Sequence, residues 1–412
     1  MSFIVCQKRK RVLGRYWSGV LFAGVSFFSA CQAVGSTVPT IVLGDVVIKP
    51  YATDQLDIGG FPQSTVPVDG VGVRAARLRN GARITIHKQF EIGAIWDFGP
   101  VPKGPMRLFE GQVSYTGIKH FVLTAGIFKP SFGLESMQAQ GDTVFIERSS
   151  ISTITRNLAA GIARQAVQIE AHGKHYHIAI AGTAGTAGPD HDGNQRAMVF
   201  RLVGVPVSTH DLLVHVGFSG EWVFKAAQSP GQAPAVDFSD FPELNVGLTG
   251  KFLNTGKIPL KDAGAFGLEA AVAWKKLLLA GEAYEIEANK RIETGVQHLH
   301  FSGWYAQASY TLLGTPRKWK SRTAAFSSPT CQKNRTFLCD GAGVVEAAAR
   351  FSEADLRSGA VNGGRQQAWS AALTWWPVDI LRVTLQYENG KIQEVNNTER
   401  FQAVLSMMQI KF

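Results

Sequence analysis

Most of the chain alternates between apolar and polar residues with a period of two, in segments of about ten residues separated by turn residues. In the segment LRVTLQYE, for example, Val383, Leu385 and Tyr387 fall on one face, and the residues between them are polar or charged. Successive side chains of a β-strand point to opposite faces of the sheet. Each segment would therefore have one apolar face and one polar or small face, and the pattern predicts an all-β protein.

The alternation marks sixteen candidate strands, and a further short strand would fit at 41–49. The sixteen lie at 71–86, 89–98, 107–117, 120–128, 161–171, 175–182, 196–205, 211–224, 241–253, 264–274, 277–287, 301–313, 342–353, 366–376, 379–390 and 401–412. Short turns alternate with long connections in the first half of the chain, which is typical of an up-and-down barrel. The phase slips between 254 and 341, so we expect at least one misplaced strand there.

Two architectures fit this pattern: a soluble barrel or sandwich with a buried apolar face, or a transmembrane barrel with its apolar face toward lipid. Charge recurs on the polar faces, and the last strand ends at Phe412, with Met408 and Ile410 at alternate positions before it. Aromatic residues also gather near predicted strand ends, as in an interfacial girdle: Trp96, Phe98, Trp304, Tyr305, Tyr310, Trp375, Trp376 and Tyr387. These features favour a transmembrane antiparallel β-barrel of about 16 strands.

The N-terminus has the layout of a signal peptide: a basic region, an apolar run from Trp17 to Phe28, and small residues up to Ala33. A membrane anchor is the alternative, but the apolar run is shorter than the roughly 20 residues of a spanning helix. Cys31 leaves lipid attachment open as a second alternative. We expect residues 1–33 to be the signal peptide, 34–70 a periplasmic lead-in segment, and 71–412 the barrel.

Charge and cysteine content narrow the range of partners. The chain has 42 Lys and Arg against 32 Asp and Glu. Five of the basic residues lie in the first 33, so the excess of positive charge after cleavage is modest and does not indicate nucleic-acid binding.

Outside the signal region, the cysteines of the sequence are Cys331 and Cys339. In an exported protein they predict a loop disulfide rather than a metal site.

Several sequence motifs follow one another along the chain. The main one is LTAGIFKPSFGLESMQAQGDTVFIERS at 123–149, which includes Gly126, Phe128, Lys129 and Pro130. The others are VRAARLRNG (73–81), WDF (96–98), WYAQASYTLLG (304–314), EAAARFSEADLRSG (346–359) and LTWWPVDILRVTLQYE (373–388). In this order the motifs resemble the phosphate-selective porin O and P family. The chain departs from the family pattern at Ala75, where an Arg is common, and at Ile127, where a Gln is common.

The resemblance implies a sixteen-stranded homotrimeric porin of the bacterial outer membrane, surrounded by lipid. It also implies an extracellular loop folded into the pore and a lumen lined by Arg and Lys that conducts anions such as phosphate or pyrophosphate. No cofactor or reaction is implied. Because the chain departs from the family pattern at Ala75 and Ile127, the resemblance implies the family's fold more strongly than its phosphate preference.

Three arginines share one face of the first predicted strand: Arg77, Arg79 and Arg83, with apolar residues on the other face. If the apolar face meets lipid, the guanidiniums would line the lumen and offer fork-like donors to anion oxygens. The alternative is that lumenal acids such as Glu91 and Asp97 pair with them and leave a weakly selective pore. We assign the three arginines and Asp97 to the anion pathway.

The connection 129–160 is longer than an ordinary turn, and long structured loops are usually functional. We interpret it as a constriction loop inside the barrel, with Lys129 at its root and Arg148 and Arg156 presenting charge to the pore. An ordinary surface loop is the alternative.

No catalytic constellation or nucleotide-binding loop was found in the sequence. His172, His175 and His177 could hold a metal only with further ligands, so a polar lumen face is the simpler interpretation. The sequence therefore predicts a passive outer-membrane channel for small anions. The alternatives are a general or sugar-acid diffusion porin and, in another class, a secreted β-rich carbohydrate-binding protein.

Overall fold

The computed structural model describes residues 40–65, 70–99, 106–161, 163–186, 193–228, 231–331, 341–394 and 397–412. All of them belong to one compact unit, Gly35–Phe412. The predicted signal peptide, residues 1–33, lies outside the described residues.

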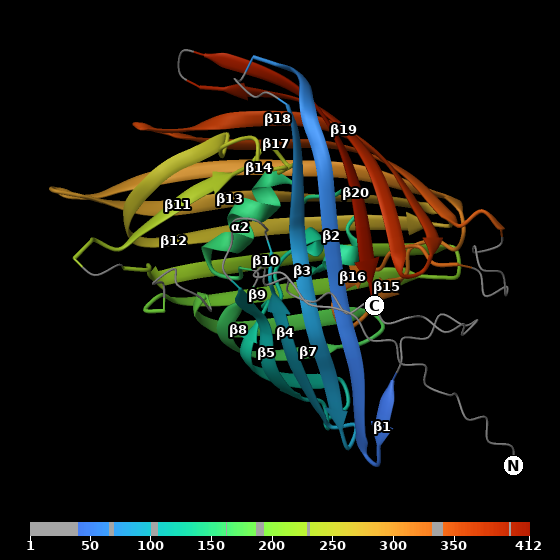
Figure 1. Ribbon diagram of the computed structural model, residues 1–412. Helices are drawn as coiled ribbons and strands as arrows, with labels where there is room; N and C mark the ends of the chain where they lie inside the picture. The colour runs from blue at the N-terminus through green and yellow to red at the C-terminus, as the bar shows by residue number, and fades with distance from the viewer. Residues whose placement is uncertain are drawn as a thin grey trace, which may run out of the picture. The chain divides into compact units, whose positions relative to one another are not determined.

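Sixteen antiparallel strands form a closed barrel (Figure 1). They are β2 (Val46–Ser64), β3 (Val71–Ile86), β4 (Phe90–Asp97), β5 (Arg107–Tyr115), β6 (Phe121–Phe128), β7 (Arg164–His172), β8 (Tyr176–Thr186), β9 (Arg196–Ser208), β10 (Leu212–Lys225), β12 (Leu253–Trp274), β13 (Leu277–Ile292), β14 (Gly295–Leu313), β17 (Val344–Ser358), β18 (Val361–Val378), β19 (Leu381–Gln393) and β20 (Thr398–Lys411). Each strand pairs with the next, and the ring closes where β20 pairs with β2, for example Ile410 with Asp54. Closure removes the exposed strand edges that a membrane would not tolerate.

The barrel strands are accompanied by several shorter strands and helices. β1 (Ile41–Leu43) forms a hairpin with β2, and β11 (Ala235–Asp240) pairs with the start of β12. β15 (Trp319–Lys320) and β16 (Ala325–Phe326) form a separate two-stranded sheet. The helices are α1 (Leu134–Met137), the 3₁₀ turn η1 (Gln140–Asp142) and α2 (Ser150–Leu158). In the described part of the chain, no helix has the length and apolar character needed to cross a membrane.

The prediction of a barrel of about 16 strands is confirmed, but one predicted strand is wrong. Segment 241–253 has no strand before Leu253. Its apolar residues Leu244 and Val246 alternate because both pack against Ile146 and the lumenal side of β20. The missing strand is β2, which lies within the predicted lead-in segment 34–70, so the barrel begins earlier than the sequence predicted.

The outer surface of the barrel is strongly apolar. Leu268 is 65% exposed and Trp369 is 64% exposed, values that a water-facing surface would penalise and a lipid-facing one favours. Six of the eight aromatics expected in a girdle are likewise exposed: Trp96, Phe98, Trp304, Tyr310, Trp375 and Tyr387. Tyr305 and Trp376 are buried, so their assignment to the girdle is wrong. Each follows an exposed aromatic directly, and adjacent strand residues face opposite sides.

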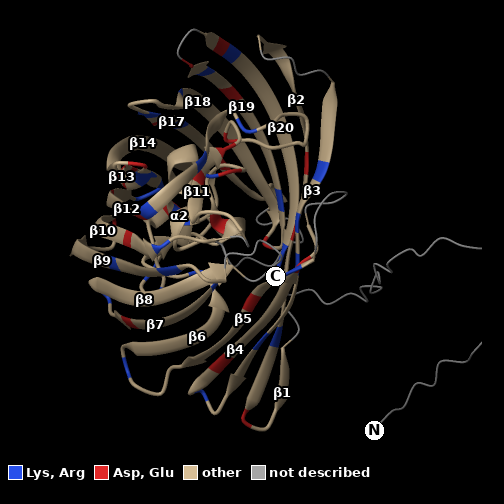
Figure 2. Cartoon of the chain, turned by 90° about the vertical axis from the view of Figure 1, so that its left-hand side faces the viewer, with Lys and Arg blue, Asp and Glu red and all other residues tan. Residues whose placement is uncertain are grey.

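Residues 129–161, called the inserted loop below, run from the end of β6 into the barrel (Figure 2). Helix α2 of this loop contacts β12, β13, β14 and β17 on the far wall. Its residues Ile151, Ile154 and Leu158 recur at helical spacing and are buried in a cluster with lumenal residues of these strands. Burying each such side chain contributes about 1.5–3 kcal/mol. An ordinary surface loop would not be buried in this way, so the prediction of an inward-folded loop is confirmed.

A second segment enters from the opposite end. Short turns such as 87–89, 173–175 and 379–380 mark that end, where the final residue Phe412 exchanges backbone hydrogen bonds with Ala52. Residues 314–331, the second loop, follow β14 at this short-turn end. Ala325 and Phe326 of the second loop pack against Leu134 of the inserted loop. The two loops therefore meet inside the barrel.

Candidate functional site

The three arginines of β3 all form ion pairs on the inner side of the barrel. Arg77 pairs with Glu147 of the inserted loop (Nη2–Oε2 2.6 Å), and Arg79 pairs with Asp97 of β4 (Nε–Oδ2 2.7 Å).

The third guanidinium, that of Arg83, pairs with Glu110 of β5 (Nη2–Oε2 2.8 Å), yet its side chain stays 55% exposed. The geometry thus contains both alternatives weighed from the sequence, an arginine row and lumenal ion pairing. Glu91, expected as a partner of the row, pairs instead with Arg322 of the second loop.

A fourth arginine joins the row through a bulge that the sequence did not reveal. The register between β2 and β3 shifts at Gln55/Leu56, where Ala76 is unpaired. Because the extra residue reverses the parity, Arg74 faces inward like Arg77 and donates to the backbone carbonyl of Asn245 (3.1 Å).

Lys129 lies at the root of the inserted loop, as predicted. Its Nζ donates to the carbonyl oxygens of Ser136 (2.5 Å) and Gln138 (3.4 Å). Among the residues that the structure describes, no carboxylate forms an ion pair with it. Burial, with the nearby positive charges of Arg148 and Arg156, holds the pKa of Lys129 well below its ordinary value.

Arg148 and Arg156 occupy different environments in the inserted loop. Arg148 donates to the carbonyls of Glu135 and Gln138 and to the side chain of Gln140 (2.7–3.0 Å), so it holds the loop in shape. Burial lowers its pKa to about 9, with a further contribution from Arg156.

The Arg156 side chain on α2 is buried with one donor unsatisfied. It is 6% exposed, and its Nε finds no hydrogen-bond partner in the described structure. Burial, together with the charge of Arg77, lowers its pKa to about 10. A buried, unsatisfied guanidinium donor is costly, and an anion oxygen would satisfy it.

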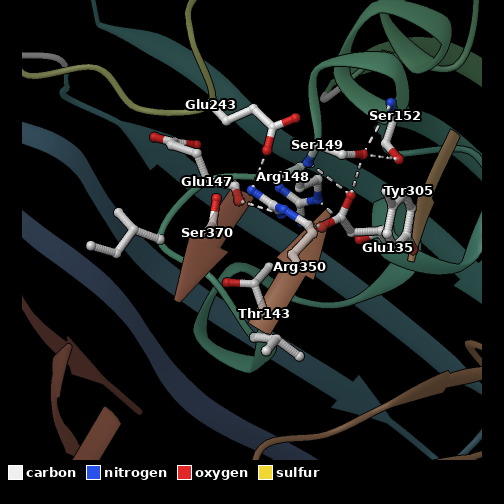
Figure 3. A network of polar contacts seen from close by, with 12 residues as sticks. Glu135, Thr143, Glu147, Arg148, Ser149, Ser152, Glu243, Tyr305, Arg350 and Ser370 are labelled. Atoms are coloured by element: carbon white, nitrogen blue, oxygen red, sulfur yellow. Dashed lines mark hydrogen bonds and ion pairs between the residues drawn. The ribbon is translucent and has the colours of Figure 1, made fainter. Parts of the chain in front are cut away.

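A buried ion cluster anchors the inserted loop to the barrel wall (Figure 3). Arg350 of β17 donates to Glu135 of the loop (Nη1–Oε1 3.2 Å) and to Glu243 (Nη2–Oε2 2.6 Å). Glu135 in turn accepts hydrogen bonds from the backbone and hydroxyl of Ser149, the N-cap of α2. Both carboxylates are thus fully engaged in holding the loop.

Gly133 shows how closely the loop fits. Its φ of 65° belongs to the left-handed region, and a Cβ there would overlap the Tyr284 hydroxyl and the Glu282 carboxylate. That carboxylate accepts from the backbone N–H groups of Leu134 and Glu135 (2.6 and 3.0 Å).

Sequence reasoning missed several lumenal cations. Arg201, Arg350 and Arg382 are almost fully buried on the inner faces of β9, β17 and β19. Their positions on the polar parity of alternating strands were the available signal. The second loop adds Arg317, Lys320 and Arg322, which the run RKWKSR displays in the sequence.

One of the two cysteines of the predicted disulfide lies in the described part of the chain. Cys331 is disulfide-bonded, and its predicted partner Cys339 lies outside the described residues.

The histidines considered as metal ligands lie near the turn between β7 and β8. His177 contacts Ser131 on the lumenal side (Nε2–Oγ 3.0 Å), which agrees with a polar lumen face. Within the described ranges, no group of three His, Cys, Asp or Glu side chains has the geometry of a metal site.

The family model for phosphate-selective porin O and P matches residues 70–412. The chain belongs to this family. This porin is a β-barrel protein of the bacterial outer membrane. It is 23% identical to Porin O of Pseudomonas aeruginosa over 309 residues, which cover 70% of this chain and 69% of that protein.

Solved structures share the fold at low identity. An anion-selective porin from Comamonas acidovorans superposes with a TM-score of 0.57 at 10% identity, covering 89% of this porin and 100% of that chain. The outer-membrane protein OmpT of Vibrio cholerae, in its trimer form, gives a TM-score of 0.53 at 10% identity and covers 89% of this porin and 99% of that chain.

Proposed function

We propose that this porin is a passive channel for small anions, with phosphate or pyrophosphate preferred over chloride. Lys129 carries the proposal. Its ammonium is held by two backbone carbonyls rather than by a carboxylate, at the root of a loop that fills part of the lumen. A partly dehydrated anion would gain an ion pair there without breaking one.

Arg156 supports the same conclusion, because its unsatisfied Nε is a second buried donor in the same loop. The ion-paired arginines Arg77, Arg79 and Arg83 lie along β3, and their remaining N–H donors can bind a passing anion. Multivalent anions benefit most, since a narrow low-dielectric passage strengthens each charge interaction while several weak sites still permit release.

The test is phosphate block of chloride current in planar bilayers. Lys129→Ala should weaken the block about tenfold, the factor that corresponds to 1.4 kcal/mol of binding free energy. Lys391→Ala is the matched control, because this lysine lies in β19 on the outward parity, away from the lumen. Equal effects of the two substitutions would mean that phosphate is attracted only by the general positive charge of the protein. That result would contradict a phosphate preference set by Lys129.

The alternative within the class is a general or sugar-acid diffusion pore. It predicts no block by phosphate and permeation of neutral sugars in liposome swelling. The density of lumenal arginines favours the anion channel.

We also propose that this porin assembles as a homotrimer. The V. cholerae OmpT structure of the same fold is described as a trimer form, and the family resemblance implies the same state. Mass measurement in native detergent solution should give three chains for each particle.

A further inference from the structure

Asp142, in the inserted loop, is the point at which three parts of the barrel meet. Its Oδ1 accepts from Lys411 Nζ of β20 at 2.6 Å, and from the backbone N–H and hydroxyl of Ser328 in the second loop at 3.1 and 2.9 Å. Its Oδ2 lies 3.2 Å from Lys320 Nζ of the second loop. Arg317 of that loop also donates to the backbone carbonyl of Asp142 (2.5 Å). One aspartate thus joins both loops to the last strand.

The carboxylate and its two lysines differ in their access to water. The Asp142 side chain is 4% exposed, whereas Lys320 is 53% exposed and Lys411 is 34% exposed. The lysines therefore keep their charge in contact with water, whereas the carboxylate is shielded from it. A Cβ on neighbouring Gly141 would overlap the Lys411 side chain, which would then have to move away from its position beside Asp142.

The two arginines of the second loop have acids of their own. Arg317 forms a buried bidentate pair with Glu346 of β17 (2.6 and 2.7 Å). Arg322 pairs with Glu91 at 2.7 Å and lies 3.7 Å from Glu170. Lys320 and Lys411, in contrast, share the single carboxylate of Asp142, so this group carries one net positive charge at the short-turn end.

We propose that Asp142 is a selectivity-determining residue: it acts as a fixed internal counter-anion that halves the charge Lys320 and Lys411 present to the lumen. Its role is to limit how long an anion dwells between these lysines, because a strongly bound anion would not leave the channel. The proposal rests on the proposed anion conduction and adds a second control point to the loop that contains Lys129.

The experiment compares Asp142→Asn with wild type in planar bilayers. Asparagine keeps the size and the hydrogen-bond acceptor but removes the charge. The reversal potential under a KCl gradient should shift further in the anion-selective direction. Phosphate should block chloride current at a concentration about fivefold lower, the factor expected for one unit charge at about 4 Å in bulk water. Asp211→Asn is the matched control, since Asp211 lies in an exposed turn at the same end of the barrel.

If Asp142 has a purely structural role, Asp142→Asn should change conductance or stability but leave the reversal potential unchanged. An unchanged reversal potential in a correctly inserted Asp142→Asn channel would therefore overturn the proposal. If Asp142→Asn does not insert, the double variant Lys320→Met/Lys411→Met decides. It should reduce anion selectivity and weaken phosphate block, and an unchanged reversal potential would overturn the proposal. A wild-type channel without anion selectivity would instead contradict the proposed function itself.

Discussion

The Nη2 atom of Arg77 lies 2.6 Å from Oε2 of Glu147, so a guanidinium of the barrel wall pairs with a carboxylate of the inserted loop. The two side chains are only 12% and 20% exposed, so water screens the pair weakly. The contact holds the loop against β3 and at the same time cancels one positive charge of the lumen.

Glu147→Gln should therefore increase anion selectivity. The amide keeps a hydrogen-bond acceptor for Arg77 but leaves the guanidinium charge uncompensated. The anion-to-cation permeability ratio should rise about fivefold, the effect of ~1 kcal/mol at one charge, measured as the reversal potential under a KCl gradient. Glu285→Gln is the control because Glu285 is an exposed residue of β13 paired with His300. Matching shifts in both variants would argue against a local effect.

Replacing Arg77, Arg79 and Arg83 together by Ala should move the reversal potential past neutrality toward cation selectivity. Three lumenal carboxylates would lose their partners, namely Glu147, Asp97 and Glu110. A reversal potential that stays at the wild-type value would show that ions do not pass along β3.

Anion selectivity should also fall with rising pH, at a pH below the ordinary pKa of lysine. Burial and neighbouring cations depress the pKa of Lys129, so this lysine loses its proton below the ordinary value of about 10.4. The depressed pKa means that the folded barrel binds fewer protons than the unfolded chain, so its stability should rise with pH over the same pH range. Lys129→Met should reduce the pH dependence of the reversal potential, and the part that remains belongs to Arg148 and Arg156, whose pKa values burial also lowers. A variant that keeps the full dependence would rule out Lys129 as a source.

Arg350→Met should destabilise the barrel and loosen the inserted loop. Removing one partner of a buried ion pair typically costs about 3–5 kcal/mol, and here Glu135 and Glu243 both lose their guanidinium. The temperature of the heat-modifiable gel transition should drop, and single-channel conductance should increase. Arg357→Met on the same strand is the control, since its pair with Asp355 is partly exposed and worth at most ~1 kcal/mol. Equal transition temperatures for the two variants would refute the anchoring role.

Much of the barrel could be predicted from the sequence because a lipid-facing wall and a wet lumen impose the period of two on each strand. The prediction failed where apolar alternation has another cause. Leu244 and Val246 face the inserted loop rather than lipid. β2 was missed because its glycines and its outward Asp54 weaken the apolar face.

The site was predictable in composition but not in pairing. Arg77, Lys129 and Arg156 could be assigned to the lumen from parity and loop length. Arg77 pairs with Glu147 of the inserted loop, Lys129 is held by carbonyls of its own loop, and Arg156 keeps an unsatisfied Nε. These differences depend on how the loop folds inside the barrel, which a period of two does not encode. The second loop was missed since its short strands β15 and β16 give no periodic signal.

The most direct test of the central claim is the reversal potential of the wild-type channel in a planar bilayer under a tenfold KCl gradient. An anion-selective lumen centred on Lys129 and Arg156 predicts a potential of the sign set by chloride, and addition of phosphate should reduce the chloride current. A potential near zero or of the sign set by potassium would contradict the account.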